Sequence, residues 1–351
     1  MIRRIITFIV IITVLSCVAC IDEVDFDIPN EFQNSTVIIG KIVKGNPSTV
    51  EVSIQKVFDF TFRIEQLITA KSVNIVNEEG DKLDVPVSGT GQFKLSIDPD
   101  SAFKVEVGKS YSLEVLLFDG QSFKSEHVKL IGAPEVESFE PELVSKEVLD
   151  DNNEPTNRTR IEYKISTSLL SGIEQSRTNL RWNFSRTLKL TDDLDNVCYA
   201  TNLVDFDLIQ LINHNDIVAS SLNDHLVLEQ IPSPILVEGQ YVFVIQEALD
   251  DGALQFWKQI NQLSTNSGTF FEPPPGQLTS NFNKTSNIDG SVFGYFYATQ
   301  HDTLSAYVDG EFFGSSTKYC PRPLTGGPMP CDECCICTQF FPTEKPSFWI
   351  N

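Results

Sequence analysis

The chain has 351 residues, a formal net charge of -22, eight cysteines and four histidines. Because Lys and Arg must neutralise phosphates to give nucleic-acid affinity, so acidic a chain is not expected to bind DNA or RNA. Hydrophobic residues make up 41% of the chain, which excludes an acidic disordered segment and is enough to form a core. At this length a single core usually divides, so two domains are expected.

The N-terminus has the pattern of an export signal. Arg3 and Arg4 precede an apolar run over residues 5–19, which is shorter than the roughly 20 residues that span a bilayer as a helix. A positive start, an apolar segment and small residues before a cysteine are the order of a signal peptide. Residues 1–19 are therefore predicted to be a lipoprotein signal peptide, followed by an anchor linker over 20–33.

Two cysteines compete to be the lipidated residue. Residues 14–17 (Val-Leu-Ser-Cys) match the usual lipobox better by residue type, whereas residues 17–20 have an unusual first position. Lipidation at Cys20 removes Cys17 with the signal peptide and leaves six cysteines, an even number suited to disulfides in an oxidising compartment. Lipidation at Cys17 would leave one unpaired thiol. Cys20 is therefore preferred, Cys17 is the alternative, and membrane lipid is the partner of the acylated cysteine.

Residues 34–132 predict an immunoglobulin-like β-sandwich, because short alternating segments rich in β-branched residues follow one another between turns. The dipeptide Asp119-Gly120 predicts a hairpin, since it accepts the positive φ angles of a two-residue turn. No cysteine lies in this region to bridge its sheets. Strands are expected at 36–43, 49–57, 72–76, 111–118 and 121–128.

A second β-rich domain is predicted over 160–319. The intervening residues 133–159 are rich in Pro, Glu, Asp and Asn and are expected to form a linker and a loop. Between 250 and 263, apolar residues recur every three positions, which predicts a helix with one apolar side formed by Leu254, Trp257, Ile260 and Leu263. Strands are expected at 161–165, 180–188, 240–246, 292–298 and 304–308.

The Cys/Pro-rich tail, residues 320–351, is rich in Pro and Gly, so it is not expected to form a core of its own and needs disulfides to hold it. Its Cys-x-x-Cys-Cys-x-Cys cluster at 331–337 could bind zinc, because thiolates at this spacing hold one tetrahedral ion. It lacks a second Cys-x-x-Cys pair and a nearby histidine, so disulfides are preferred and no metal or cofactor is expected. Their 15 pairings stay open. The cysteines expected in disulfides are Cys198, Cys320, Cys331, Cys334, Cys335 and Cys337.

No segment of the sequence predicts an enzyme. Asp192, Asp193 and Asp195 could hold calcium, but the loop lacks the glycine and the distant glutamate of an EF-hand, so a solvated loop is preferred. The histidines are scattered and no nucleophile, phosphate-binding or dinucleotide-binding motif is present. The tryptophans Trp182, Trp257 and Trp349 could stack on sugars, although the patterns around the first two favour core packing.

A set of short segments, spread in order over the chain, has a recognisable pattern: Cys20–Ile28, Leu180–Phe184 with Cys198-Tyr199, Gln255–Lys258, Phe270–Leu278, Val292–Phe296 and Lys345–Trp349. Together these segments resemble the family called domain of unknown function 4249, whose members are lipoproteins of Bacteroidota. The chain departs from the family pattern at Ser280, which stands where a glycine usually precedes Asn281.

The resemblance implies lipidation at Cys20 and a place in the outer membrane for a protein often encoded beside a TonB-dependent receptor, and it carries over no catalytic residue. The acidic residues after Cys20 resemble an export signal to the cell surface, although a periplasmic face stays open. The expected function is a non-enzymatic accessory or ligand-capture partner of a TonB-dependent transporter. The alternatives are a stand-alone surface module that binds glycan or peptide, and a structural subunit of an envelope or secretion assembly.

Overall fold

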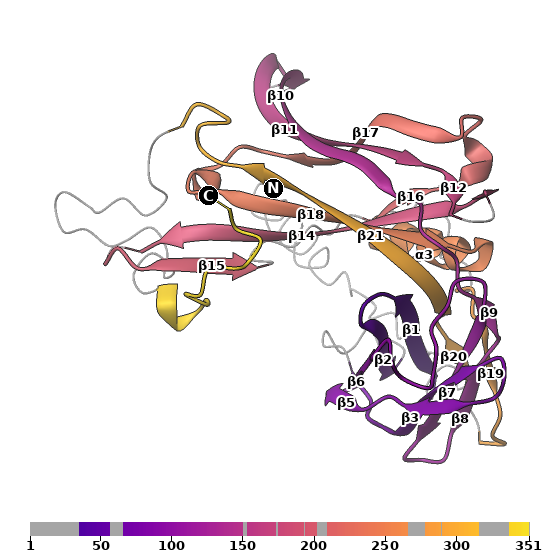
Figure 1. The fold of residues 1–351 in the computed structure, drawn as a ribbon. Helices are drawn as coiled ribbons and strands as arrows, with labels where there is room; N and C mark the ends of the chain where they lie inside the picture. Colours follow the sequence, from indigo (N-terminus) through magenta and orange to yellow (C-terminus); the bar gives the residue numbers. More distant parts are fainter. Residues whose placement is uncertain are drawn as a thin grey trace, which may run out of the picture.

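The structure, a computed structural model, describes residues 35–56, 66–149, 153–172, 175–192, 194–201, 209–265, 278–288, 290–315 and 337–350. Within these ranges the protein is mainly β, as the sequence predicts, with one α-helix. The strands form two sandwiches that lie one above the other in Figure 1, with β21 running from the lower to the upper one.

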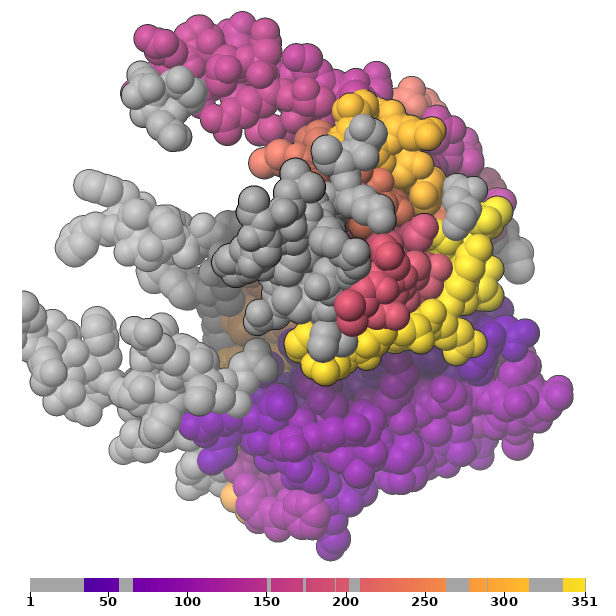
Figure 2. Space-filling view, turned by 90° about the vertical axis from the view of Figure 1, so that its left-hand side faces the viewer, coloured from indigo at the N-terminus to yellow at the C-terminus, as the bar shows by residue number. Residues whose placement is uncertain are grey.

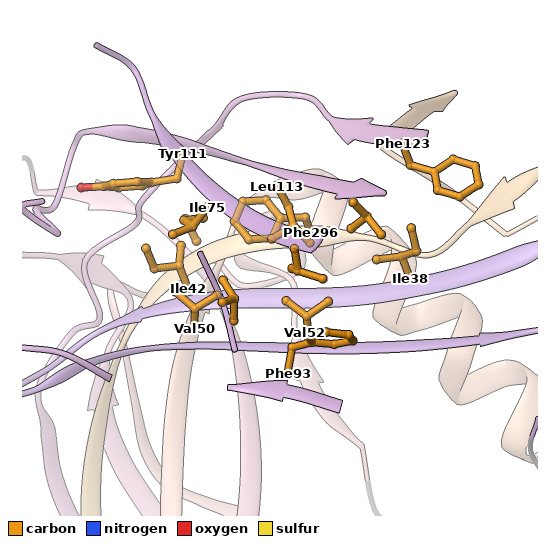
Figure 3. Packing of buried hydrophobic residues seen from close by; sticks show 14 of the residues in the cluster. Ile38, Ile42, Val50, Val52, Ile75, Phe93, Tyr111, Leu113, Phe123 and Phe296 are labelled. Carbon is orange, nitrogen blue, oxygen red and sulfur yellow. The ribbon is translucent and has the colours of Figure 1, made fainter. Parts of the chain in front are cut away.

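The first sandwich encloses the N-terminal core. Its inner residues alternate along each strand, so that Ile38 and Val50 face Leu113 and Phe123 across the interface (Figure 3). One sheet contains β1 (Thr36–Lys44), β2 (Ser48–Lys56), β6 (Gln92–Ile97) and β5 (Val87–Gly89). The facing sheet contains β19 (Phe282–Lys284), β8 (Ser122–Ser125), β7 (Ser110–Leu117), β3 (Ala70–Asn77), β4 (Lys82–Asp84) and β9 (Val128–Lys129).

The hairpin between β7 and β8 confirms the turn predicted at Asp119-Gly120. Gly120 has φ +91°, a conformation that favours glycine, and the Asp119 carboxylate accepts a 2.9 Å hydrogen bond from the Gln121 amide. Local turn chemistry is therefore enough to place this pair of strands.

The second sandwich encloses a core around Trp182 and Tyr163, both fully buried. One layer holds β15 (Val197–Thr201), β14 (Asn179–Thr191), β16 (Gln210–Ile212), β18 (Gln240–Leu249) and part of β21 (Phe296–Val308). The other layer holds β10 (Val136–Leu149), β11 (Pro155–Ser168) and β17 (Ser221–Gln230). Small elements complete it: β12 (Leu170–Ser171), β13 (Ser176–Arg177), and 3₁₀ turns at His214–Asp216, Pro234–Leu236 and Cys337–Gln339.

The region expected as a linker and loop, residues 133–159, instead contains β10 and the start of β11. The two strands pair over their whole length, but β17 pairs with β11 only along Ile161–Ser168. The outer half is therefore a two-stranded ribbon with charged residues on both faces, and this removes the apolar alternation that predicts a strand. The ribbon protrudes at the top of Figure 2.

β21 joins the two sandwiches into one ten-stranded sheet. Its first half pairs parallel with β1 through Phe296–Gln300, and its second half pairs antiparallel with β18 through His301–Val308. β19 and β20 (Val292–Phe293) also pair with strands of the first sandwich. The boundaries predicted at 34–132 and 160–319 are corrected accordingly, because late residues complete the first sandwich and 292–308 is not two separate strands of the second.

Gly294 lies at the bend between β20 and β21, within one of the segments that resemble the family. It has φ +101°, and a Cβ added there would lie 2.0 Å from the carbonyl oxygen of Ile38. Only glycine fits this close approach to β1. The bend brings the late chain against the first sandwich.

Asn281 fastens the late chain to the same place. It is buried, its side-chain amide donates to the Phe296 carbonyl at 2.8 Å, and its side-chain oxygen accepts from the Phe296 amide at 2.9 Å. The neighbouring Ser280, which replaces the family glycine, accepts a 3.3 Å hydrogen bond from the Phe282 amide. The Asn281 side chain thus gives the Phe296 backbone the two hydrogen bonds that a neighbouring strand would otherwise supply.

Replacing Asn281 with alanine is expected to lower the free energy of unfolding by about 2–4 kcal/mol, because two buried backbone groups of Phe296 lose their partners. Urea denaturation measures the loss. The matched control is Asn283→Ala, an exposed residue of the adjoining strand β19, with an expected change within about 0.5 kcal/mol. Equal stabilities of the two variants would contradict this role for Asn281.

Candidate functional site

Helix α3 (Asp251–Thr265) lies against the ten-stranded sheet where the two sandwiches meet (Figure 1). Asp250 caps its start, accepting a 2.6 Å hydrogen bond from the Ala253 amide. The helix predicted at 250–263 is confirmed, but its most buried residues are Ala253, Leu254 and Phe256, while Trp257 lies half-buried at the edge. That position brings the Trp257 indole beside the polar residues of the sheet.

Five charged side chains form a row across the sheet at this junction, which we call the charge ladder. They alternate in sign along the row, which passes over β21 between β1 and β18: Lys94 on β6, Glu51 on β2, Lys41 on β1, Glu247 on β18 and Arg181 on β14. The ladder lies on the face turned away from the first core, because Lys41 and Glu51 alternate with the buried Ile42 and Val50.

Each member of the ladder touches the next. Lys94 Nζ lies 2.8 Å from a Glu51 carboxylate oxygen, and Lys41 Nζ lies 3.6 Å from the other. Lys41 Nζ also donates to Glu247 at 3.0 Å, and Arg181 Nη1 donates to Glu247 at 3.2 Å. Tyr297 on β21 completes the network, because its hydroxyl donates to Glu247 at 3.3 Å and accepts from Arg181 Nη1 at 3.2 Å.

The charged state of the ladder follows from these contacts. Burial alone would raise the pKa of Glu247, whose side chain is 1% exposed, but Lys41 and Arg181 lower it below the ordinary value. Burial opposes the charge of Lys41, yet the neighbouring Tyr297 and Glu247 raise its pKa. Burial and Glu247 raise the pKa of Tyr297 to about 12, so its hydroxyl keeps its proton. At neutral pH the ladder therefore carries three cations and two anions.

A cleft of about 240 Å³ opens over the ladder at the junction. Trp257 forms one wall together with Arg181, whose guanidinium carbon lies 3.4 Å from the centre of the indole ring, a cation–π contact. The other wall is polar and comes from the first sandwich. The polar and aromatic residues that line the cleft are Lys41, Glu51, Ser53, Gln92, Arg181, Trp257 and Tyr297.

Two of these side chains carry buried donors without acceptors. Among the described residues, neither Arg181 Nε nor Trp257 Nε1 has a hydrogen-bond partner. Both groups can only donate, so what each of them lacks is an acceptor atom. An arrangement with surplus charge and unmet donors suits binding of an acceptor-rich ligand.

Sequence reasoning did not find the cleft, because each strand contributes one charged residue and these are spread from Lys41 to Glu247. The only local signal is a single charge between apolar or buried neighbours, as in Leu180-Arg181-Trp182. Trp182 itself lies in the second core and donates to Gln246 at 2.9 Å, as expected for a packing tryptophan.

The cysteines predicted to form disulfides are partly described. Cys198 on β15 is bonded to Cys337, with the two Cα atoms 6.1 Å apart. The other four cysteines expected in disulfides, Cys320, Cys331, Cys334 and Cys335, lie outside the described residues, as do Cys17 and Cys20.

The disulfide fastens the C-terminal segment 337–350 to the outer face of the ten-stranded sheet. The Tyr199 amide donates to the Pro342 carbonyl at 2.8 Å. Trp349 is buried between Tyr199 and Tyr241, with ring centres 5.1 and 5.0 Å away. The segment, yellow in Figure 2, therefore covers an aromatic cluster on a face that also carries the charge ladder.

The acidic loop at Asp192, Asp193 and Asp195, which was expected to be solvated, is only partly exposed to solvent. The Asp192 side chain is buried and accepts hydrogen bonds from the amides of Leu194, Asn196 and Cys337. It therefore supports the disulfide segment, while Asp193 lies outside the described residues. Where the chain is described, no group of three or more His, Cys, Asp or Glu side chains is placed to hold a metal ion.

Acid is expected to weaken the ladder. Glu247 and Glu51 both have a pKa below the ordinary value of 4.5, so the stability they add is complete above that value and decreases as pH falls through the lowered pKa. Urea midpoints measured from pH 7 to 3 should therefore stay level down to about pH 5 and then fall. The fall should be shallower in Glu247→Gln, and parallel curves for the two proteins would contradict this assignment.

The fold and the cleft define a mainly β protein in which one sheet is shared by two sandwiches and a polar cleft opens at their junction. The family described as "Domain of unknown function (DUF4249)" matches residues 21–305, so the chain belongs to this family, as its sequence segments indicated. Searches among curated proteins and among solved structures found no significant match. In the described part of the chain, no helix combines the length and the apolar character needed to cross a bilayer.

Proposed function

We propose that this protein is an outer-membrane lipoprotein, held at the cell surface by acylated Cys20, that captures a ligand for a TonB-dependent transporter without transforming it. The observation that carries the capture role is the cleft of about 240 Å³ with its unmet donors. The anchor is supported by the order of Arg3, Arg4, the apolar run and Cys20.

The state of the two carboxylates in the ladder favours binding over hydrolysis. A general acid needs a raised pKa to keep its proton at neutral pH. The pKa of Glu51 and that of Glu247 are instead lowered, and both carboxylates are held in ion pairs. A binding role, in contrast, needs no proton transfer and is compatible with two ionised, ion-paired carboxylates.

The same cleft also supports a second candidate, a surface module that binds a glycan or a peptide without a transporter. The two functions differ only in the partner. The protruding ribbon of β10 and β11 supports the transporter hypothesis. In the half of the ribbon that β17 does not reach, the outer edges of both strands have unpaired backbone groups, and a strand of another chain could pair with them.

Co-purification tests the transporter hypothesis. The full-length chain, produced in its own host and extracted in mild detergent, should carry a β-barrel receptor through affinity capture and gel filtration. The control is Cys20→Ala, which should lose both fatty-acid labelling and membrane fractionation, whereas Cys17→Ala should keep both. Recovery of the lipoprotein without any barrel partner would favour the stand-alone module, and labelling of Cys20→Ala would refute the anchor.

A further inference from the structure

We propose that the cleft over the charge ladder binds a small hydroxylated carboxylate the size of one uronic acid residue. Its carboxylate lies on the side of Arg181 and Lys41, and its hydroxyl groups face Glu51, Ser53 and Gln92. In naming the ligand class, the inference rests on the capture role proposed above, but the binding itself can be measured on the purified protein.

The charge balance of the ladder calls for one anion. Glu247 is shared between Lys41 and Arg181, and Glu51 is paired with Lys94, so one positive charge is left over in a partly buried place. Arg181 is 12% exposed and shares the Glu247 carboxylate with Lys41, and a charge with so little water is costly unless it is fully paired. Since the chain has a net charge of -22, its long-range field does not attract anions, and the local surplus must select them.

The geometry of Arg181 favours a carboxylate. Its Nη1 makes both of its hydrogen bonds, to Glu247 and to Tyr297, while its Nε has no partner among the described residues. Among the described residues this edge of the guanidinium has no acceptor, and a planar carboxylate matches such an edge with two parallel hydrogen bonds. The unmet Trp257 Nε1 beside it is a further donor for a ligand oxygen.

The opposite wall suits hydroxyl groups. Gln92 Nε2 donates to Ser53 Oγ at 3.0 Å, so this wall offers an amide oxygen and a hydroxyl, and Glu51 adds acceptor oxygens. The carboxylate of Glu51 lies 2.8 Å from Lys94, which reduces its repulsion of an acidic ligand. A dianion such as phosphate would still meet that acidic wall, which favours the monoanion.

The size of the cleft limits the ligand to about one ring. Its volume of about 240 Å³ lies below the roughly 300–1,000 Å³ that encloses drug-sized ligands. An oligosaccharide could therefore place one acidic residue in the cleft and would extend outside it.

Calorimetry and Trp257 fluorescence on the full-length chain in detergent test the inference, with sodium D-galacturonate and D-glucuronate as probes. At least one uronate should bind ten-fold or more tighter than D-galactose, acetate or inorganic phosphate. Equal binding of uronate and galactose would overturn the role of the carboxylate. Phosphate binding as tight as uronate binding, or no uronate binding up to 10 mM, would overturn the proposal.

Variants locate the site. Arg181→Lys keeps the positive charge but cannot donate two parallel hydrogen bonds to a carboxylate, so it should weaken uronate binding about ten-fold. Gln92→Ala, at an exposed position, cannot unfold the core and should weaken binding several-fold without changing the melting temperature. Lys124→Gln, an exposed cation on β8, is the control and should bind as the wild type does. Unchanged binding in both Arg181→Lys and Gln92→Ala would overturn the site.

The two proposals fail separately. Loss of uronate binding with a barrel partner still recovered would overturn the ligand class and leave the transporter role standing. Uronate binding without any barrel partner would support the ligand class and favour the stand-alone module.

Discussion

Replacing Glu247 with glutamine is expected to lower the free energy of unfolding by about 3–5 kcal/mol, the range measured when one partner of a buried ion pair is removed. Glutamine keeps the shape but removes a negative charge that both Lys41 and Arg181 contact. Two cations would then face each other across a nearly dry position, since the Glu247 side chain is 1% exposed. Urea denaturation at pH 7 measures the loss.

Two further variants test whether the loss comes from charge. Glu51→Gln removes the more exposed anion of the ladder, which is 40% exposed, and should cost only about 0–1 kcal/mol. Replacing Lys41, Glu247 and Arg181 together with methionine, leucine and methionine should restore much of the stability, because no buried charge stays unpaired. The triple variant should also lose uronate binding. If Glu247→Gln costs no more than Glu51→Gln, the ladder does not stabilise the junction.

Removing the Cys198–Cys337 disulfide by the double change to serine is expected to cost about 2–5 kcal/mol. The bond closes a sequence separation of 139 residues, so its loss enlarges the conformational freedom of the unfolded chain. In the folded state it also holds the segment that buries Trp349 against Tyr199 and Tyr241. The variant should therefore melt earlier and lose its C-terminal segment first under limited proteolysis.

The control for the disulfide is Phe340→Ala, because Phe340 lies in the same segment but is 57% exposed. Its expected effect is within about 0.5 kcal/mol. If the double variant keeps both the wild-type midpoint and its resistance to protease, the aromatic packing alone holds the segment.

The predictions that succeeded rest on short-range patterns. The turn at Asp119-Gly120 and helix α3 are both encoded within a few residues, by turn chemistry in one case and by period and a capping Asp250 in the other. β10 was missed because its exposed half carries charges on both faces, so that backbone pairing with β11 rather than apolar alternation makes it a strand. The boundary between the sandwiches was missed because β21 pairs with strands of both.

The sequence by itself determined that this chain is acidic, mainly β, a member of its family by a match over residues 21–305, and equipped with cysteines suited to disulfides. Only the tertiary structure decided which cysteines meet and where the cleft lies. The reason is distance along the chain: Lys41, Arg181 and Glu247 are brought together by strand order in a shared sheet, and pairing between distant strands leaves no periodic signal in any one of them.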